Sequence, residues 1–455
     1  MSKVFFIHGW SVDSTTTYQS VHQQLGQYGF QLEEVFLGRY VSLEDRVEIG
    51  DLARAMHNEL FRLLDGNWKQ PFHFVTHSTG ALIVKKWIAD LYAEDFATAG
   101  GLKNVIFLAG PQFGSRLAHH GKSMLANAVY AGDTGDKILE ALELGSDFIW
   151  NINKLWLDET NWKAKGIRPY CITGDRVDKS VGDWFKEKIM PANYEEGSDM
   201  VIRVPAANLN HKRFRIAVEH QADGTLQTSF TQKGEIKGIP FAALKDYTHS
   251  GINHGVLNSI TTKSTPANHL ALDLLLLALN VNSNAGYADA FKRFADETAA
   301  TATVRKKRFA QLDFMFCDQD GNPINDYVFK LGAIVNGEKR PSDTVYHTHK
   351  NTVTGNHFTV FISMKELEPQ YDYFFELDSD SGSLLFSFQP DPLTVKAEKG
   401  TITDIIVAEQ TTQIEVVLQR TPDRNLFVYH KGNDPDLHIT WDRRGIITGK
   451  NKVDE

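Results

Sequence analysis

Residues 72–80, which read FHFVTHSTG, constrain the fold of this chain more than any other stretch. The first four are mostly apolar and predict a short buried strand, and a helix-like apolar run begins at Ala81. Ser78 therefore lies at a sharp turn between a strand and a helix, and His77 is expected to point into the packing between them. This context is typical both of an exposed serine nucleophile and of a simple helix N-cap. Thr76 stands where the nucleophile motif Gly-x-Ser-x-Gly has its first glycine.

Strand-like and helix-like segments alternate through the first part of the chain. Short apolar runs predict strands at 4–7, 35–37, 105–109 and 169–174. A hairpin is predicted around residues 223–224, an Asp-Gly pair between two extended runs. Alternation with helices predicts an α/β fold, with a mostly parallel sheet covered by helices on both faces. Ligands gather at the carboxyl ends of the strands in such a sheet, and Gly9, Ser78 and Gly110 each follow a predicted strand.

The pattern of predicted strands, helices and turns changes along the chain and predicts two domains. Residues 1–282 form the α/β domain, and within it 116–165 read as inserted helices, either a cap or lid over a site or extra packing helices. Residues 283–306 are rich in Ala, Thr, Asn and Ser, with some helical character around 287–294, and are interpreted as an interdomain connector. Strands and turns then alternate through 307–455, which predicts an all-β, sandwich-like accessory domain with 402–407 among its strands.

The composition excludes several classes of protein. The net charge of −9 leaves no basic excess to neutralise phosphates, so nucleic acid is not expected as a partner. The two cysteines, Cys171 and Cys317, lie in separate apolar runs and are expected to pack as small buried side chains, without a disulfide or metal site. No phosphate-binding glycine loop or dinucleotide fingerprint is present, so we expect no cofactor. The His pairs at 119–120 and 347/349 lack the accompanying Cys or carboxylate spacing of a metal site, so we expect no metal.

The ends and apolar runs of the sequence bear on localisation. Residues 1–8 contain one Lys and an apolar run too short for a signal peptide. The longest apolar run, 270–281, contains an Asp and is too short to span a membrane. We therefore expect synthesis in the cytoplasm with no Sec signal peptide or transmembrane segment, and export by a signal-independent secretion system stays open.

A serine nucleophile needs a base to take its proton and an acid to orient that base. On a sheet of this kind the three follow the order serine, acid, histidine along the chain. The sequence supplies Ser78, then Asp199 before a short extended run, then His249 or His254. We favour His249 because it lies in a loop before a helix, with His254 as the alternative base.

Two further groups of residues complete the candidate site. A glycine turn follows the first predicted strand, so the N–H of Trp10 and the N–H of Thr79 are candidates for the oxyanion hole. Asp175 and Asp178, just after a predicted strand, compete with Asp199 for the role of acid. Asp199 is favoured because it precedes an apolar run.

Several of these motifs resemble those of a known family. Residues 1 to about 281 resemble α/β-hydrolase-fold lipases and esterases, including bacterial lipases and lipid deacylases. The resemblance is carried by FIHGW at 6–10, THSTG at 76–80, LAGPQFGS at 108–115, LGSDF at 144–148 and SDMVI at 198–202. It implies that Ser78 is the nucleophile, Asp199 the acid, and Trp10 with Thr79 the oxyanion donors.

The resemblance implies a serine hydrolase that cleaves carboxylic esters of lipids, a lipase or phospholipase acting through an acyl-enzyme. Its expected partner is a lipid or a membrane-surface ester, with a protein partner possible for the β domain. The layout is also similar to that of lipase effectors that bacteria inject into competitors. The alternatives are an esterase or thioesterase acting on small or protein-bound acyl groups, and a non-catalytic binding protein on a hydrolase scaffold.

Overall fold

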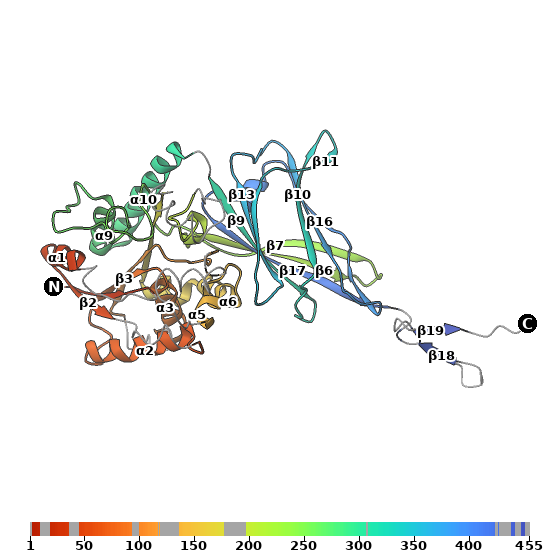
Figure 1. Ribbon diagram of the computed structural model, residues 1–455, viewed down its shortest axis with the longest axis horizontal. Helices are drawn as coiled ribbons and strands as arrows, with labels where there is room; N and C mark the ends of the chain where they lie inside the picture. Colours follow the sequence, from red (N-terminus) through yellow and green to blue (C-terminus); the bar gives the residue numbers. More distant parts are fainter. Residues whose placement is uncertain are drawn as a thin grey trace, which may run out of the picture.

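The computed structural model describes residues 2–9, 19–35, 45–92, 100–116, 118, 136–176, 197–305, 308–423, 426, 438–441 and 447–450. Two regions lie side by side along its long axis (Figure 1). The first combines strands and helices, and the second is built almost entirely of strands.

The first region is built on a six-stranded sheet in the order β2-β1-β3-β4-β5-β8, in which every neighbouring pair is parallel. Its strands are β1 (Ser2–Ile7), β2 (Phe30–Val35), β3 (Phe72–His77), β4 (Leu102–Leu108), β5 (Arg168–Asp175) and β8 (Phe241–Lys245). The sheet confirms the predicted α/β fold class. Because β1, β3 and β4 are neighbours, the segments that follow them meet at one edge of the sheet.

Helices cover both faces of this sheet. One face carries α2 (Ile49–Leu63), α3 (Gly80–Trp87) with its π-helical extension (Ile88–Tyr92), α5 (Asp136–Leu142), α6 (Asp147–Trp156) and the short α8 (Val204–Ala207). The other face carries α1 (Gln19–Gln27), α9 (Leu270–Asn280) and α10 (Asn284–Val304).

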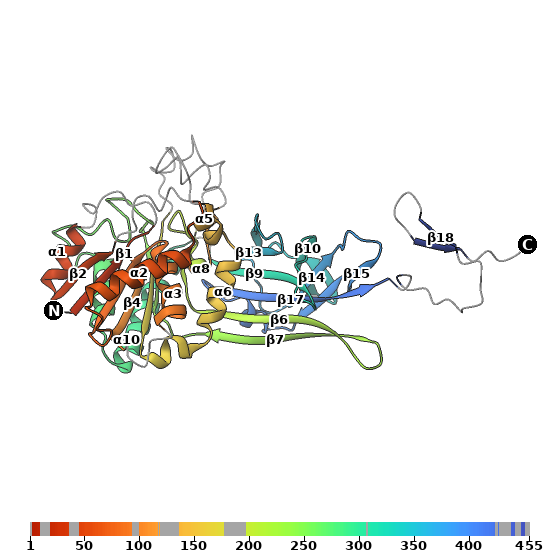
Figure 2. The same ribbon diagram turned by 90° about the horizontal axis from the view of Figure 1, so that it is seen from below.

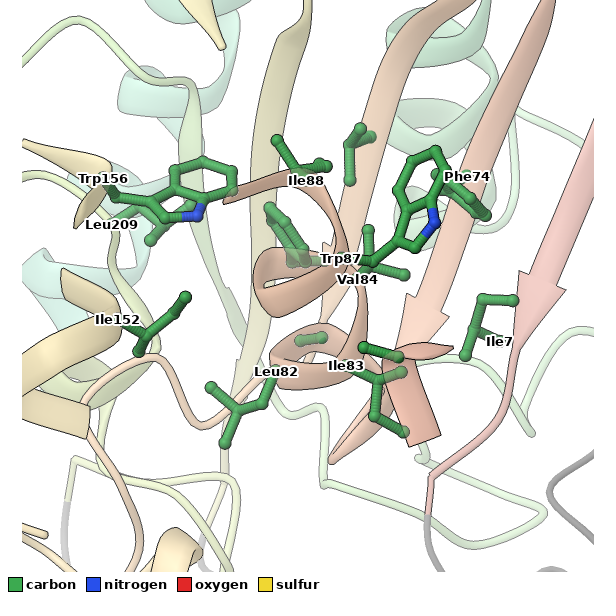
Figure 3. Close-up of a cluster of buried hydrophobic side chains, with 14 of the residues drawn as sticks. Ile7, Phe74, Leu82, Ile83, Val84, Trp87, Ile88, Ile152, Trp156 and Leu209 are labelled. Atoms are coloured by element: carbon green, nitrogen blue, oxygen red, sulfur yellow. The ribbon is translucent and has the colours of Figure 1, made fainter. Parts of the chain in front are cut away.

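Alternating side chains of each strand serve the two faces. Phe5 of β1 belongs to the core under α2 and α3, whereas its neighbour Phe6 packs into the core under α9. In the first core, Trp87 and Trp156 are fully buried on α3 and α6. Figure 3 shows side chains of α3 between those of α6 on one side and Phe74 of β3 on the other.

The described part of the insertion at 116–165 has a packing role. Helix α6 buries Ile149, Ile152 and Trp156 against α3, in the core of the first region. Two short 3-10 turns follow it, at Glu159–Asn161 and Lys163–Lys165. Residue 117 and residues 119–135 of the insertion lie outside the described part of the chain.

The second region is a sandwich of two sheets. One has the order β12-β13-β9-β17-β6-β7, with β15 also paired to β17, and the other has the order β11-β10-β14-β16. Their strands are β6 (His211–His220), β7 (Leu226–Ile236), β9 (Phe309–Asp318), β10 (Tyr327–Val335), β11 (Glu338–Pro341), β12 (Val345–Lys350), β13 (His357–Ser363), β14 (Asp372–Ser379), β15 (Phe386–Gln389), β16 (Leu393–Ala397) and β17 (Thr411–Pro422). Phe314 and Phe375 are fully buried in the apolar core between the sheets. Near the end of the chain, β18 (His438–Trp441) and β19 (Ile447–Lys450) form an antiparallel pair.

The boundary between the two regions corrects the domain prediction. The predicted hairpin is confirmed as β6 and β7, but β6 pairs in parallel with β17 of the second region (Figure 2). The chain therefore leaves the first sheet after β5, contributes a hairpin to the second region, and returns as β8. The predicted β domain of 307–455 was too narrow, because the second region also includes β6. Its partner strand β17 lies about 200 residues further along the chain.

The predicted connector at 283–306 was wrong, because helix α10, which makes up most of it, packs into the core of the first region. One face of this helix carries Ala290, Phe294, Thr298 and Thr301, all buried at helical spacing. The Thr298 hydroxyl accepts a hydrogen bond from the N–H of Ala243 at 3.0 Å and donates one to the carbonyl of Phe241 at 2.9 Å. The helix thus satisfies backbone groups on β8, the edge strand of the first sheet.

The strand predicted at 402–407 was also wrong. The structure has a short helix, α11 (Ile402–Ile405), there, and Ile402, Ile405 and Ile406 pack into the sandwich core. Apolar residues at positions i, i+3 and i+4 fall on one face of a helix, so this spacing outweighed the β-branched composition.

Two further observations concern the cysteines and the helices. Cys171 and Cys317 are both buried and unpaired, as predicted. Within the described ranges, no helix has the length and apolar character needed to cross a membrane.

The buried amine of Lys85 provides a test of the first core. Its Nζ donates to Asn153 Oδ1 at 2.8 Å, and burial lowers the pKa of Lys85 to about 7. The unfolded chain therefore holds this proton between pH 7 and the ordinary value near 10.5, whereas the folded chain does not, so stability rises with pH over that window. In urea unfolding, we expect the wild type to gain stability relative to Lys85→Met between pH 7 and pH 10. The exposed Lys69→Met variant keeps Lys85 and is the control, so its stability should follow the same pH dependence as that of the wild type. Equal pH slopes in wild type and Lys85→Met would contradict the assignment.

The contact between α3 and β1 provides a second test. A Cβ at Gly80 would lie 2.4 Å from the carbonyl oxygen of Ile7 and 2.8 Å from that of His8. Gly80→Ala should therefore destabilise the fold by about 1–3 kcal/mol through overpacking against rigid backbone. Gly26 of α1 is exposed and a Cβ there would meet nothing within 4 Å, so Gly26→Ala should stabilise by about 0.5–1 kcal/mol. Thermal unfolding of both variants checks the opposite signs, and a stabilised Gly80→Ala protein would refute the close contact.

Candidate active site

Ser78 lies at the turn between β3 and α3 in an unusual backbone conformation. Its φ is +55°, in the left-handed region that non-glycine residues rarely adopt. Its N–H donates to the carbonyl of Leu108 on β4 at 3.0 Å. A Cβ on Gly9 would lie 2.9 Å from the Cβ of Ser78, so only glycine allows the loop after β1 to approach so closely. The serine is therefore held in a strained turn above the sheet, the geometry that presents a nucleophile.

Thr76 fits the place of the missing motif glycine. It is the last but one residue of β3, in register with Ile7 of β1 and Phe107 of β4. Its side chain is fully buried, and its hydroxyl lies 3.5 Å from the carbonyl oxygen of Ile106. A β-branched side chain is well suited to a buried strand, so the departure from glycine does not disturb the turn.

Three of the predicted site residues lie in a hydrogen-bonded line. His249 Nε2 is 3.0 Å from Ser78 Oγ, and His249 Nδ1 is 2.9 Å from Asp199 Oδ2. A carboxylate only accepts, so Nδ1 carries the hydrogen and Nε2 is left to accept from the serine hydroxyl. Asp199 is fully buried and His249 nearly so, whereas Ser78 is partly exposed.

A tight turn of residues 199–202 orients the carboxylate of Asp199. Its Oδ1 accepts from the N–H groups of Val201 at 3.0 Å and Ile202 at 2.7 Å. The second oxygen faces His249, and the Thr173 hydroxyl lies 3.5 Å from it. The main chain adds a further link, because the N–H of His249 donates to the carbonyl of Asp199 at 2.8 Å. Both carboxylate oxygens are therefore occupied, and the carboxylate is fixed toward the histidine.

The alternative residues have other surroundings or lie outside the described ranges. His254 supports the histidine loop through its carbonyl, which accepts from the N–H of Thr248 at 2.8 Å. Asp175 is ion-paired with Arg305 of the segment after α10. Asp178, the other candidate acid, lies outside the described residues.

The two predicted oxyanion donors differ in what the structure describes. Thr79 is buried directly after Ser78, one residue before α3, at the positive end of that helix. Trp10 lies outside the described residues, although Gly9 before it is packed against Ser78.

His77 supports the site in a way that the sequence did not reveal. Its Nε2–H donates to the carbonyl of His249 at 3.0 Å, and the two ring centroids are 5.0 Å apart. Burial lowers the pKa of His77 to about 3, and burial also lowers the pKa of His8 to about 4. Both side chains are therefore neutral near pH 7. The only signal for this role was that His77 adjoins Ser78, and its partner is 172 residues away.

Among the described residues, no group of three or more His, Cys, Asp or Glu side chains is arranged to hold a metal ion. His349, which the sequence places in a His-x-His string, instead bonds Glu143 Oε1 through its Nε2 at 2.9 Å.

The fold of this chain is similar to that of solved structures. Neither the models of known protein families nor the curated protein sequences contain a match. Among solved structures, the chain is similar to phospholipase PlaB from Legionella pneumophila, with 27% identity and a TM-score of 0.82 over 96% of this chain and 97% of that one. A structure of the same phospholipase in complex with thio-NAD gives 27% identity and a TM-score of 0.83 over 99% of each chain.

The likeness covers both regions, so the whole arrangement of hydrolase sheet and β sandwich is shared. The chain is an α/β-hydrolase of the lipase and esterase type, and by class a carboxylic ester hydrolase.

Proposed function

We propose that this chain hydrolyses carboxylic esters of lipids, with Ser78 as nucleophile, His249 as general base and Asp199 as the acid that orients the base. The observation that carries the proposal is the hydrogen-bonded line of 3.0 Å from Ser78 to His249 and 2.9 Å from His249 to Asp199. These distances lie within the range that proton transfer between a nucleophile and its base requires.

In the first half of the reaction, His249 Nε2 takes the proton of Ser78 as Oγ attacks the ester carbonyl carbon. The resulting tetrahedral intermediate collapses when the bond from carbon to the alcohol oxygen breaks. His249 returns the proton to that oxygen, the alcohol leaves, and the acyl group remains on Ser78 as an ester. In the second half, water attacks the acyl carbon with the same base, and the carboxylic acid leaves as Ser78 regains its proton.

Asp199 acts on His249 without changing its own charge. It accepts from Nδ1, which keeps Nε2 free for the serine proton, and it stabilises the imidazolium that forms in each half-reaction. The two N–H donors on its Oδ1 keep the carboxylate in place during both steps.

We assign the oxyanion hole to the backbone N–H of Thr79 and, from the sequence, that of Trp10. Two observations support this placement: Thr79 directly follows Ser78 at the start of α3, and Gly9 brings the loop after β1 against Ser78. Backbone N–H groups fixed in this way stabilise the charge that develops on the carbonyl oxygen.

A phospholipid is the substrate that we favour, because the chain resembles a phospholipase over nearly its full length. A protein that binds without catalysis would not need a serine, a histidine and a buried carboxylate in line. An esterase or thioesterase for small acyl groups would use the same three residues, so substrate assays must separate it from a lipase.

Removal of the nucleophile is the first test. Ser78→Ala should lower kcat for ester hydrolysis by about 10⁴-fold or more, and Asp199→Asn should also lower kcat by several orders of magnitude. Circular dichroism and thermal unfolding should show that both variants remain folded. His254→Ala is the matched control and should keep catalysis within about tenfold, since its side chain lies outside the hydrogen-bonded line. Wild-type rates in Ser78→Ala would refute the proposal.

The substrate class is tested by product analysis. Purified protein is incubated with vesicles of mixed phospholipids, and with short-chain esters in parallel, and products are identified by mass spectrometry. We expect free fatty acid and lysophospholipid from the vesicles, and neither product with Ser78→Ala. Hydrolysis confined to the short-chain esters would make the chain a small-ester esterase instead.

A further inference from the structure

The turn that holds Asp199 is closed at both ends. The N–H of Asp199 donates to the carbonyl of Ile202 at 3.1 Å, and the N–H of Val204 donates to that of Gly197 at 2.9 Å. Ser198 and Arg203 form an antiparallel bridge between these two bonds. Gly197 and Arg203 therefore lie at the base of the turn, one at each end.

Both residues at the base of the turn contact one aromatic ring of the β sandwich, that of Phe309 at the start of β9. Gly197 has a φ of +74°, and a Cβ on it would lie 2.7 Å from Phe309 Cδ2. The guanidinium carbon of Arg203 is 5.1 Å from the centroid of the same ring. Strand β9 adjoins the first region here (Figure 1).

Two more rings of the sandwich surround Arg203. Its guanidinium carbon is 4.3 Å from the centroid of Phe361 on β13 and 5.2 Å from that of Tyr346 on β12. Arg203 is only 4% exposed. A desolvated guanidinium is attracted to the faces of aromatic rings. The aromatic cluster of Phe309, Tyr346 and Phe361 therefore binds Arg203 at the base of the turn.

The sandwich contacts the neighbourhood of the turn at two further points. The Thr411 hydroxyl on β17 donates to the carbonyl of Pro205 at 3.1 Å. Arg305 pairs with both Asp175, at the end of β5, and Glu409, just before β17. The end of β5 and the segment after Arg203 are thus both tied to the second region.

We infer that Arg203 is a positioning residue for catalysis: seated in the aromatic cluster of the sandwich, it holds the turn that aims Asp199 at His249. The inference rests on the proposed function of Ser78, His249 and Asp199. It makes the β sandwich part of the catalytic apparatus, because the rings that seat the turn all come from it.

The experiment compares four single variants of the full chain in hydrolysis of a soluble ester. Arg203→Met removes the charge, Arg203→Lys keeps a cation over the rings, and Phe309→Leu removes the shared ring. Glu143→Gln is the control, because Glu143 bonds His349 and Thr352 elsewhere on the same interface between the regions. Urea unfolding of each variant gives the loss of stability against which activity is judged.

Arg203→Met should lower kcat by about 10- to 100-fold with KM changed less than about threefold, because it displaces Asp199, which acts in the transition state, and removes no substrate contact. His249 faces Asp199 and the neutral His77, so displacing Asp199 removes the negative charge that favours the imidazolium. The acid limb of kcat/KM should therefore move to lower pH. Arg203→Lys should recover part of kcat and of the acid limb.

The control and the milder variants decide between positioning and simple loss of stability. Glu143→Gln should keep the wild-type kcat within about twofold and its acid limb unchanged, even where its stability matches that of Arg203→Met. If Arg203→Met does not fold, Arg203→Lys and Phe309→Leu must still show the lowered kcat and the shifted limb, and their double variant must be non-additive.

Two results overturn the inference. In the first, activity depends on Ser78, but the Arg203 and Phe309 variants have the same kcat and acid limb as Glu143→Gln. This result contradicts the positioning role alone. In the second, hydrolysis continues in Ser78→Ala. This result contradicts the proposed function, and the positioning role with it.

Discussion

The left-handed backbone of Ser78 is the constraint on which the rest of the first region depends. A non-glycine residue in this conformation costs about 1–2 kcal/mol, so its surroundings must hold it there. The N–H bond to Leu108 on β4 and the close approach of Gly9 and Gly80 to the turn do so. The price of the turn is offset by the packing of α3 across the sheet, and the result is a hydroxyl raised at the edge where β1, β3 and β4 end.

A second constraint comes from the way the two regions share the chain. The segment between β5 and β8 carries the Asp199 turn and also the β6–β7 hairpin, which pairs with β17 of the sandwich. The carboxylate that faces His249 therefore lies on the connection between the two sheets. Along the same border, Glu143 bonds His349 and Thr352, and the Asn208 amide donates to the carbonyl of Glu409 at 2.8 Å. A polar, hydrogen-bonded border of this kind fixes the orientation of the regions more closely than apolar contact alone.

Features that local residues determine could be predicted from the sequence. The strand, turn and helix around Ser78 follow from adjacent apolar runs, and the order of Ser78, Asp199 and His249 follows from the order of strands in a parallel sheet. Features that depend on distant partners could not. Helix α10 was mistaken for a connector because its buried face includes Thr298 and Thr301, whose hydroxyls bond β8, and threonines carry no hydrophobic period. Arg203 reads in the sequence as an ordinary surface charge, since its three rings lie more than 100 residues away.

The proposed chemistry depends on His249 making Ser78 nucleophilic. It is tested most directly by treating the protein with a fluorophosphonate and mapping the covalent adduct by peptide mass spectrometry. We expect one phosphonylated residue, Ser78, in the wild type, with labelling slowed by orders of magnitude in His249→Ala while the fold is retained. An adduct on another residue, or labelling of Ser78 at an undiminished rate in His249→Ala, would contradict it.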